Sequence, residues 1–241
     1  MNGFIISLGF IFILIGLVLT KENARYLLAG YNTLPEKEKE KVDIKGLVHY
    51  FRKFHIFMGV SSILAGLTIA NMIDYNIAGL FIAIYTILAY IYFFLRTRRY
   101  SKNSLGRNSM AGIYILSVAL LIIIIIFGYG SMNNNIFIEN NDIIIKGMYG
   151  ETIDMEKIQS IELTSSIPAI GGKINGYILG NTRKGYFRTV ESEKVKLLLN
   201  SNKKPVILII KLTGEKIYFS GNKKSNKEIF AEIEKTFKPG P

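Results

Sequence analysis

Residues 110–130 have the sequence MAGIYILSVALLIIIIIFGYG, a run without Lys, Arg, Asp or Glu that decides how the chain is organised. A helix needs about 20 mainly apolar residues to cross the hydrocarbon layer of a bilayer, and this run meets that length. Directly after it, residues 131–140 read SMNNNIFIEN, where a polar tract gives way to short alternating segments. We therefore predict two domains, a membrane domain at 1–130 and a soluble domain at 131–241.

Three further apolar runs precede this one, at about 3–20, 54–73 and 77–95, and none contains Lys, Arg, Asp or Glu. Each is long enough for a membrane span. A buried helix of a soluble core usually has a polar edge, which disfavours that alternative here. The first run is predicted to be a retained span rather than a signal peptide, because no Lys or Arg precedes it and no A-x-A-like site follows. The sequence thus predicts an α-helical transmembrane bundle of four spans.

Basic residues in the short loops predict the orientation of these spans. The loop 21–53 carries eight Lys and Arg residues, the loop 96–109 carries five, and the hairpin 74–76 carries none. The positive-inside rule therefore places both basic loops in the cytoplasm. The N-terminus and the soluble domain are then extracytoplasmic. The lipid bilayer is an expected partner, and loop 96–109, which has no acid, is a candidate for contact with anionic lipid.

The first of these loops contains our candidate contact residues Tyr31 and Asn32. Gly30 can end one helix, and Thr33 with Glu36 has the spacing of a capping box that begins another. As a binding loop, Tyr31 and Asn32 would contact a ligand or lipid. As a structural joint between two helices, they would lie at the membrane interface with Tyr31 among the headgroups. The joint is the favoured interpretation.

The spacing of charged and apolar residues predicts local structure before and within the second span. Glu36–Lys39 and Glu38–Lys41 are expected to pair one helical turn apart. Apolar residues within 47–55 predict an amphipathic helix that lies on the inner membrane surface and turns into the span. Within the span, Ser62 and Gly66 have the small-xxx-small spacing of a helix-packing contact.

The soluble domain is predicted to be mostly β, with one closing helix. Ser225 and Glu228 have capping-box spacing, and Ile229, Phe230 and Ile233 follow on one helical face. Turn residues such as Asn140-Asn141 and Thr213-Gly214 separate the apolar segments before it. The expected strands are 136–139, 142–148, 157–163, 173–179, 185–190, 194–199, 205–212 and 215–219.

Two motifs carry family resemblances. The pattern Ile167-Pro168…Gly172-Lys173…Gly176-Tyr177…Gly180…Lys184-Gly185-Tyr186-Phe187 is similar to bacterial PH-like domains found next to membrane spans. The resemblance implies an all-β PH-like barrel, a strongly bent antiparallel sheet capped by the C-terminal helix. The stretch AGYNT at 29–33 with EKEK at 36–39 and Asp43 is similar to an uncharacterised bacterial multi-span membrane family with an AGYNT…EEK…D signature. It implies a bacterial cell membrane location and no particular activity.

The PH-like resemblance also raises the question of a ligand. PH domains commonly bind phosphoinositides through basic residues in the loop between the first two strands, and here residues 139–142 read ENND, which is acidic. This departure disfavours phosphoinositide binding. Three basic residues farther on, Arg183, Lys184 and Arg188, are our candidates for ligand or lipid contact in this domain. A protein or peptide is the other expected partner.

The composition narrows the classes of function. The chain has no Cys and two His residues, which disfavours a thiol nucleophile, a Cys-ligated metal and His-based catalysis, so no catalytic, cofactor or metal residue is assigned. The net charge of +12 belongs largely to the loops of a multi-span protein, which disfavours nucleic acid as a partner. We expect a non-enzymatic, membrane-anchored binding or scaffold module. The alternatives are an envelope-stress or bacteriocin-immunity type factor and, less favoured, a small transporter or membrane enzyme; the oligomeric state is left open.

Overall fold

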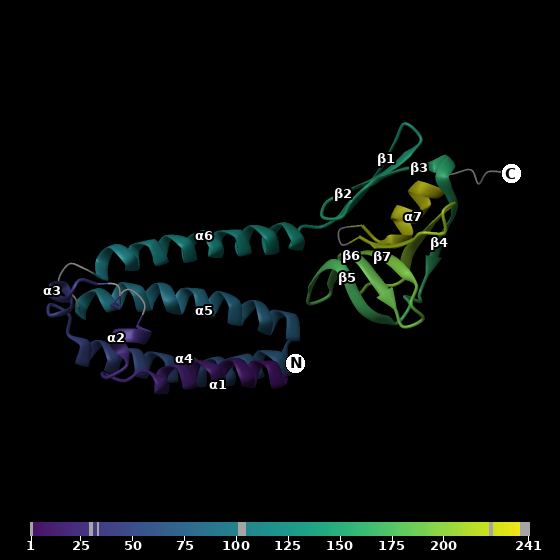
Figure 1. The fold of residues 1–241 in the computed structure, drawn as a ribbon. Coiled ribbons are helices and arrows are strands. Elements are labelled where there is room, and N and C mark those ends of the chain that lie inside the picture. Colours follow the sequence, from purple (N-terminus) through teal and green to yellow (C-terminus); the bar gives the residue numbers. More distant parts are fainter. Residues whose placement is uncertain (1, 29–30, 33, 101–104, 222–223, 237–241) are drawn as a thin grey trace. The chain divides into compact units, whose positions relative to one another are not determined.

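A computed structural model describes the chain except for residues 1, 29–30, 33, 101–104, 222–223 and 237–241, and the side chains of 105–109. The chain divides into two compact units, Met1–Ile124 and Ile125–Pro241 (Figure 1). Gly30, Thr33 and part of the basic loop 96–109, which entered the sequence predictions, lie outside the described residues. We describe each unit by itself.

The first unit is helical. Asp43 begins its longest helix by accepting a hydrogen bond from the backbone N–H of Gly46, and Asp74 begins the next by accepting from Asn76 and Ile77. Side-chain caps of this kind satisfy backbone donors that a helix start leaves free. The helical elements are α1 (Asn2–Val18), α2 (Ala24–Leu27), α3 (Glu36–Lys39), α4 (Ile44–Met72), α5 (Tyr75–Thr97), the 3₁₀ turn η1 (Arg98–Tyr100) and α6 (Leu105–Ser131), which continues into the second unit.

Three described helices are long and apolar enough to cross a membrane, Ile44–Met72, Tyr75–Tyr100 and Met110–Ser131. The first predicted span instead forms α1, an apolar helix of 17 residues. It ends at Val18 because the Asn23 side chain donates to the Val18 carbonyl at 2.7 Å, and the Thr20 N–H donates to Asn23 at 2.7 Å. Four spans were expected, and three helices reach the length criterion.

The predicted surface helix before the second span differs from the observed structure. Its residues form the beginning of α4, a single helix of 29 residues. Leu47 and Val48 are buried against Leu19 and Ala24 of the same unit, so their apolar face is covered by protein. The two ion pairs predicted beside it are confirmed, each at 2.8 Å. Pro35, rather than Thr33, is the N-cap of α3.

Glycines allow α1 and α4 to pack closely. A Cβ placed on Gly59 would lie 2.5 Å from the Gly9 carbonyl oxygen, and one on Gly9 would lie 2.8 Å from the Gly59 carbonyl oxygen. Ser62 is buried at the same contact and donates to the Gly59 carbonyl. Small residues let helix backbones approach in a membrane, where hydrophobic burial alone does not drive helices together.

The second unit is mostly β. A three-stranded antiparallel sheet has the order β1-β2-β3, and a six-stranded sheet has the order β4-β8-β9-β7-β6-β5. The strands are β1 (Asn135–Glu139), β2 (Asp142–Lys146), β3 (Thr152–Asp154), β4 (Ile158–Thr164), β5 (Ile170–Leu179), β6 (Thr182–Thr189), β7 (Lys194–Leu199), β8 (Val206–Lys211) and β9 (Lys216–Ser220), with the 3₁₀ turn η2 (Met155–Lys157) and a final helix, α7 (Asn226–Glu234).

One strand pair departs from the antiparallel sheet that the sequence resemblance implied. β7 and β9 pair in parallel, with Val195 opposite Lys216 and Leu199 opposite Ser220. The cause is the path of the chain, because β8 lies on the far side of β9 and the hairpin from β8 to β9 brings β9 back beside β7. A mostly β unit with a final helix is therefore shown, whereas the PH-like barrel stays a prediction.

Alternating side chains give the large sheet two apolar faces. On one face, Ile207, Ile217 and Phe219 pack against the small sheet and Ile233 of α7. On the other, Phe187 and Leu197 lie in a second cluster. Strand residues alternate between faces, which explains how one β-rich run supplies both clusters. The predicted capping box of α7 is confirmed, with Ser225 and Glu228 each bonding the backbone of the other.

Candidate functional site

The three basic candidates of the second unit do not form one contact surface. Arg183, Lys184 and Arg188 all lie on β6, and their pairing with β7 is continuous. Because side chains alternate along a strand, Arg183 lies on one face and Lys184 with Arg188 on the other. Five residues also separate the two arginines, a distance of about 17 Å along the strand. Arg183 and Arg188 are exposed, whereas Lys184 is fully buried.

Lys184 is engaged inside the unit rather than with an outside ligand. Its Nζ donates a hydrogen bond to the backbone carbonyl of Met132, just after the end of α6. Burial lowers the pKa of Lys184 to about 8, because a charged ammonium is poorly solvated there. Lys184 therefore has a structural place in this fold, and its predicted contact with lipid or ligand would need this contact to break.

Tyr31 and Asn32 lie in the other unit, in a turn. Tyr31 packs, partly buried, against the apolar cluster that includes Leu28 and Leu47. The exposed Asn32 side chain donates to the Tyr26 carbonyl at 3.5 Å. These contacts are those of a joint between helices, the interpretation that the sequence favoured, and a ligand role for the two residues stays a prediction.

Polar contacts also join α4 to α5, where the sequence drew no attention to them. The buried His55 ring places Nε2 3.1 Å from the Tyr90 hydroxyl and Nδ1 2.9 Å from the Phe51 carbonyl. One turn and a half further along, the Ser61 hydroxyl lies 2.5 Å from that of Tyr85. Both ring nitrogens of His55 thus have partners, and the two tyrosines of α5 act as links between helices.

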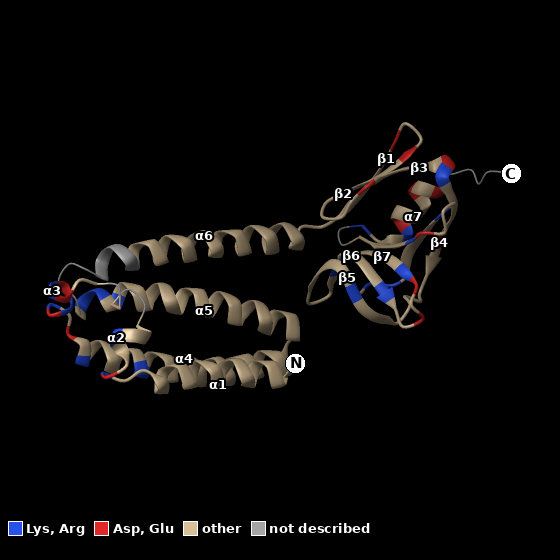
Figure 2. Ribbon diagram, in the orientation of Figure 1, with Lys and Arg blue, Asp and Glu red and all other residues tan. Residues whose placement is uncertain are grey.

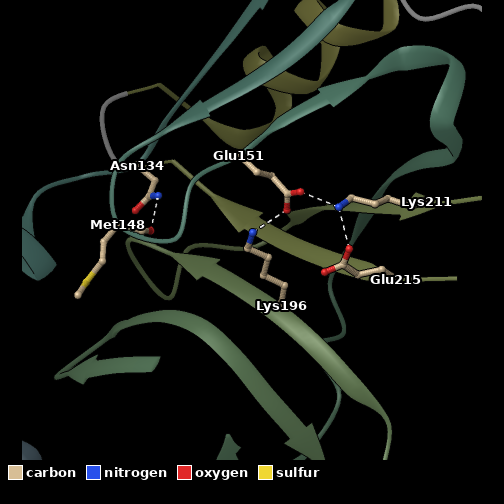
Figure 3. Close-up of polar contacts among 6 residues, drawn as sticks. All are labelled: Asn134, Met148, Glu151, Lys196, Lys211 and Glu215. Carbon is tan, nitrogen blue, oxygen red and sulfur yellow. Dashed lines mark hydrogen bonds and ion pairs between the residues drawn. The ribbon is translucent and has the colours of Figure 1, made fainter. Parts of the chain in front are cut away.

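A chain of ion pairs holds the loop before β3 on the large sheet. Glu151 accepts from Lys196 and Lys211, each at 2.6 Å, and Glu215 accepts from Lys211 at 2.7 Å (Figure 3). Burial alone would raise the pKa of Glu151, but the two lysines outweigh it and hold the pKa below its usual value. Lys196 is 3% exposed, so Glu151 rather than water solvates its ammonium group. The cluster is internally neutralised, as expected of a structural contact.

Hydrogen bonds fix the end of α6 to the sheet within the second unit. The Tyr177 hydroxyl lies 2.7 Å from that of Ser131 and donates to the Phe127 carbonyl at 3.2 Å. Asn134 and Asn200 exchange two further bonds, each of 2.9 Å. We call these residues, 127–134 with Tyr177 and Asn200, the junction. The junction leaves the strand that follows, β1, in a defined position.

The candidate binding site is a groove between β1 and α7, which we call the β1–α7 groove. Its volume is about 410 Å³. Ile136, Ile138 and Phe137 of β1 line one side, and Ile229 and Ile233 of α7 line the other. β1 pairs only with β2 among the described strands, so the backbone of its other edge is without a strand partner in that part of the chain.

Polar groups lie at the ends of this groove. Asn134 lines one end and is 1% exposed, and its carboxamide oxygen has no hydrogen-bond partner among the described residues (the amide nitrogen donates to Met148, Figure 3). Lys224 and Glu232 line the groove as well and pair with each other at 2.6 Å. A buried acceptor without a donor is costly in a folded protein, which makes the Asn134 end of the groove notable.

Sequence reasoning did not find this groove. Its two sides are about 90 residues apart in the chain, and only the fold brings them together. The available indications were the alternation of Ile136, Phe137 and Ile138 and the apolar stripe of α7, which each predict an element rather than a site. Among the described residues, no group of three His, Asp or Glu side chains is placed to hold a metal ion.

Comparison with known proteins identifies only the first unit. Residues 6–101 match a family model described as a domain of unknown function, DUF3784. This domain covers α1 to α5, with the loop that contains Tyr31 and Asn32, and ends before α6. Neither the curated proteins nor the solved structures gave a match to the chain. The helical part of the chain is thus similar to a domain of unknown function over residues 6–101.

Proposed function

We propose that this chain is a non-enzymatic, multi-pass membrane protein whose C-terminal unit binds an extended peptide segment in the β1–α7 groove. The main support for this proposal is that the unpaired edge of β1 borders a groove lined largely by apolar residues. An extended peptide that joins a sheet edge gains backbone hydrogen bonds, and pockets beside the edge accept its alternate side chains. Folded proteins usually cover or charge such an edge, so an open one beside a groove favours a binding role.

The chemistry of the groove favours a mainly apolar peptide without a large net charge. Ile136, Ile138 and Ile229 offer apolar contact, and the two charged lining residues, Lys224 and Glu232, neutralise each other. A PH-like barrel closed by α7 is compatible with this use of the fold, and we retain it as part of the proposal.

The proposal includes α1 as a fourth span. α1 runs antiparallel to α4, with Ile5 near Gly66 and Gly16 near His55. At the outer end, Asn2 donates to Asn71 near the end of α4. α1 therefore accompanies the apolar part of α4 over nearly its whole length, although it is only about 25 Å long against a hydrocarbon layer of about 30 Å.

The side of the membrane on which the C-terminal unit lies does not depend on whether α1 is a span. If α6 crosses the membrane and the basic loop before it is cytoplasmic, the C-terminal unit is extracytoplasmic for three spans as well as for four. Only the side on which the N-terminus lies changes with α1. Figure 2 supports the orientation, because the Lys and Arg residues of the helical unit gather at one end of its helices.

Peptide binding is tested with the full-length protein in lipid nanodiscs and a displayed library of extended peptides. Phe137→Ala removes an exposed side chain of the groove, and Ile174→Ala removes an equally exposed one on β5, at 47% and 46% exposure. We expect selected peptides to bind the Ile174 variant unchanged and the Phe137 variant about tenfold more weakly, the effect of losing a buried aromatic contact. Equal binding to both variants would contradict the proposal.

Orientation is tested by a single introduced cysteine. The chain has no Cys, and Lys157→Cys provides an exposed position outside the groove and outside the α7 cap. We expect an impermeant maleimide to label it in intact cells. Labelling only after lysis would place the C-terminal unit in the cytoplasm and restrict its peptide partners to that side.

A further inference from the structure

We propose that a groove on the helical unit, formed by α1, α2 and α4, binds one anionic phospholipid, with an acyl chain in the groove and the phosphate at its charged end. This α1–α2 groove lies in the uncharacterised helical domain and is separate from the peptide groove. Its volume is about 300 Å³. The proposal therefore does not depend on peptide binding.

The lining of the α1–α2 groove is wholly apolar. Ile11, Leu14, Ile15 and Val18 of α1 form one wall, and Leu27 of α2 and Phe51 of α4 close it. The α1 residues are 40–58% exposed and Leu27 is 56% exposed, so protein covers them only in part. A groove lined in this way is suited to a hydrocarbon chain, because its apolar side chains give the chain van der Waals contact and place no polar group against it.

Basic side chains stand at the end where α1 stops. Lys21 and Arg25 are exposed and lie within two residues of a lining residue, as does the exposed Arg52. Arg52 is placed there by the α1–α4 contact, since its carbonyl oxygen would lie 3.1 Å from a Cβ on Gly16. Figure 2 shows the charged residues gathered around α2 and this end of α4.

The charge balance at this end favours an anionic headgroup. Glu22, the acid of the same turn, accepts a hydrogen bond from Thr20, which holds its pKa below the usual value and keeps it charged. Glu36 pairs with Lys39 at 2.8 Å. The exposed cations next to the lining residues in the chain thus outnumber Glu22, the acid of that turn. A phosphodiester is the anion that the adjacent bilayer supplies together with an acyl chain.

The test uses the full-length protein reconstituted in vesicles of equal phosphatidylglycerol and phosphatidylethanolamine, followed by detergent extraction and native mass spectrometry. We expect one retained lipid per chain, with phosphatidylglycerol preferred at least about fivefold, the ratio that one favourable cation contact produces. Ile15→Trp fills the groove and is expected to lower retention at least about fivefold. Phe10→Trp is the control, since Phe10 is 56% exposed on α1 and does not line the groove.

A second pair of variants separates the headgroup from the acyl chain. Arg25→Gln with Arg52→Gln is expected to abolish the preference for phosphatidylglycerol, whereas Arg98→Gln with Arg99→Gln, exposed in the other basic segment, leaves it unchanged. Equal retention of the two lipids by the unchanged protein would overturn the proposal. So would equal retention by the Ile15 and Phe10 variants, and soluble glycerol phosphate that displaces the lipid would assign the site to free phosphate instead.

Discussion

The helical unit and the β unit are held together in opposite ways. In the helical unit, α1 and α4 approach each other at residues with almost no side chain, Gly9 against Gly59. In the β unit, large side chains such as Phe219 and Ile217 are fully buried between two sheets and a helix. Lipid around the helices and water around the β unit would account for the difference, because water drives apolar side chains together whereas lipid does not. Close backbone approach joins α1 to α4 in one unit, whereas side-chain volume fills the core of the other.

The largest expected effect comes from removing volume in the β unit. Phe219→Ala should cost about 3–5 kcal/mol, because Phe219 is fully buried and a cavity would remain. Ile122→Ala on α6, where the side chain is 50% exposed, should change stability by less than about 0.5 kcal/mol. Hydrogen exchange of the strands and of α6 in the full-length protein measures both. Similar losses of stability in the Phe219 and Ile122 variants would show that side-chain volume matters equally in the two units.

Adding volume should break the helical unit instead. Gly59→Leu is expected to separate α1 from α4 at a cost of about 1–3 kcal/mol, since its Cβ would meet the Gly9 backbone at 2.5 Å. Gly79→Leu on α5 is the matched control, because a Cβ there meets no atom within 4 Å. Disulfide formation between Asn2→Cys and Asn71→Cys reports the contact. A cross-link that forms equally well in both leucine variants would show that the glycine contact is unimportant.

Removing one carboxylate from the ion pairs tests how far the β unit depends on buried charge. Glu151→Gln leaves the buried Lys196 without its carboxylate and should destabilise the β unit by about 2 kcal/mol at pH 7. Because the folded pKa of Glu151 is lowered, its contribution is present above the unfolded pKa near 4.3 and is lost as the pH falls through the folded value. Denaturation of the full-length protein from pH 7 to 3 should show less acid sensitivity in the variant. If the free energy of unfolding falls equally with pH in the unchanged protein and in the Glu151→Gln variant, Glu151 does not stabilise the β unit through its charge.

The smallest effect on stability at pH 7 is expected at Lys184. Its pKa of about 8 lies below the unfolded value near 10.4, so between these values the unfolded chain holds the proton that the folded chain releases. Stability should therefore rise with pH from 8 to 10, by at most about 1.4 kcal/mol per pH unit. Lys184→Met should remove that rise and change stability at pH 7 by no more than about 1 kcal/mol. A rise that persists in the variant would assign it to another group.

Local elements were predictable from the sequence, and contacts between distant elements were not. The α7 cap was found from Ser225 and Glu228 because both partners lie within one turn. The strand at Lys194–Leu199 has its predicted bounds, whereas β3, with three residues at Thr152–Asp154, is too short to show a pattern. The parallel pairing of β7 with β9 depends on the route of β8, which no local pattern records.

The candidate site shows the same limit. Alternation along β6 was available from the sequence and separates Arg183 from Arg188, but the partner that buries Lys184 is the Met132 carbonyl, 52 residues away. The groove likewise needs β1 beside α7. Ala24, Leu28 and Leu47 illustrate the corresponding failure in the helical unit, because an amphipathic pattern predicts a covered face and does not say whether lipid or protein covers it.

The junction has a mechanical consequence. The last turn of α6 is tied to β5 through Tyr177, and the chain just after it is tied to the end of β7 through Asn134 and Asn200. Several hydrogen bonds therefore connect the helix end directly to the strands. A rotation of the last turn of α6 about its axis would be transmitted through these bonds to the β5–β6 hairpin and to the start of β1. The end of α6 is thus coupled to the sheet by hydrogen bonds as well as by the covalent chain.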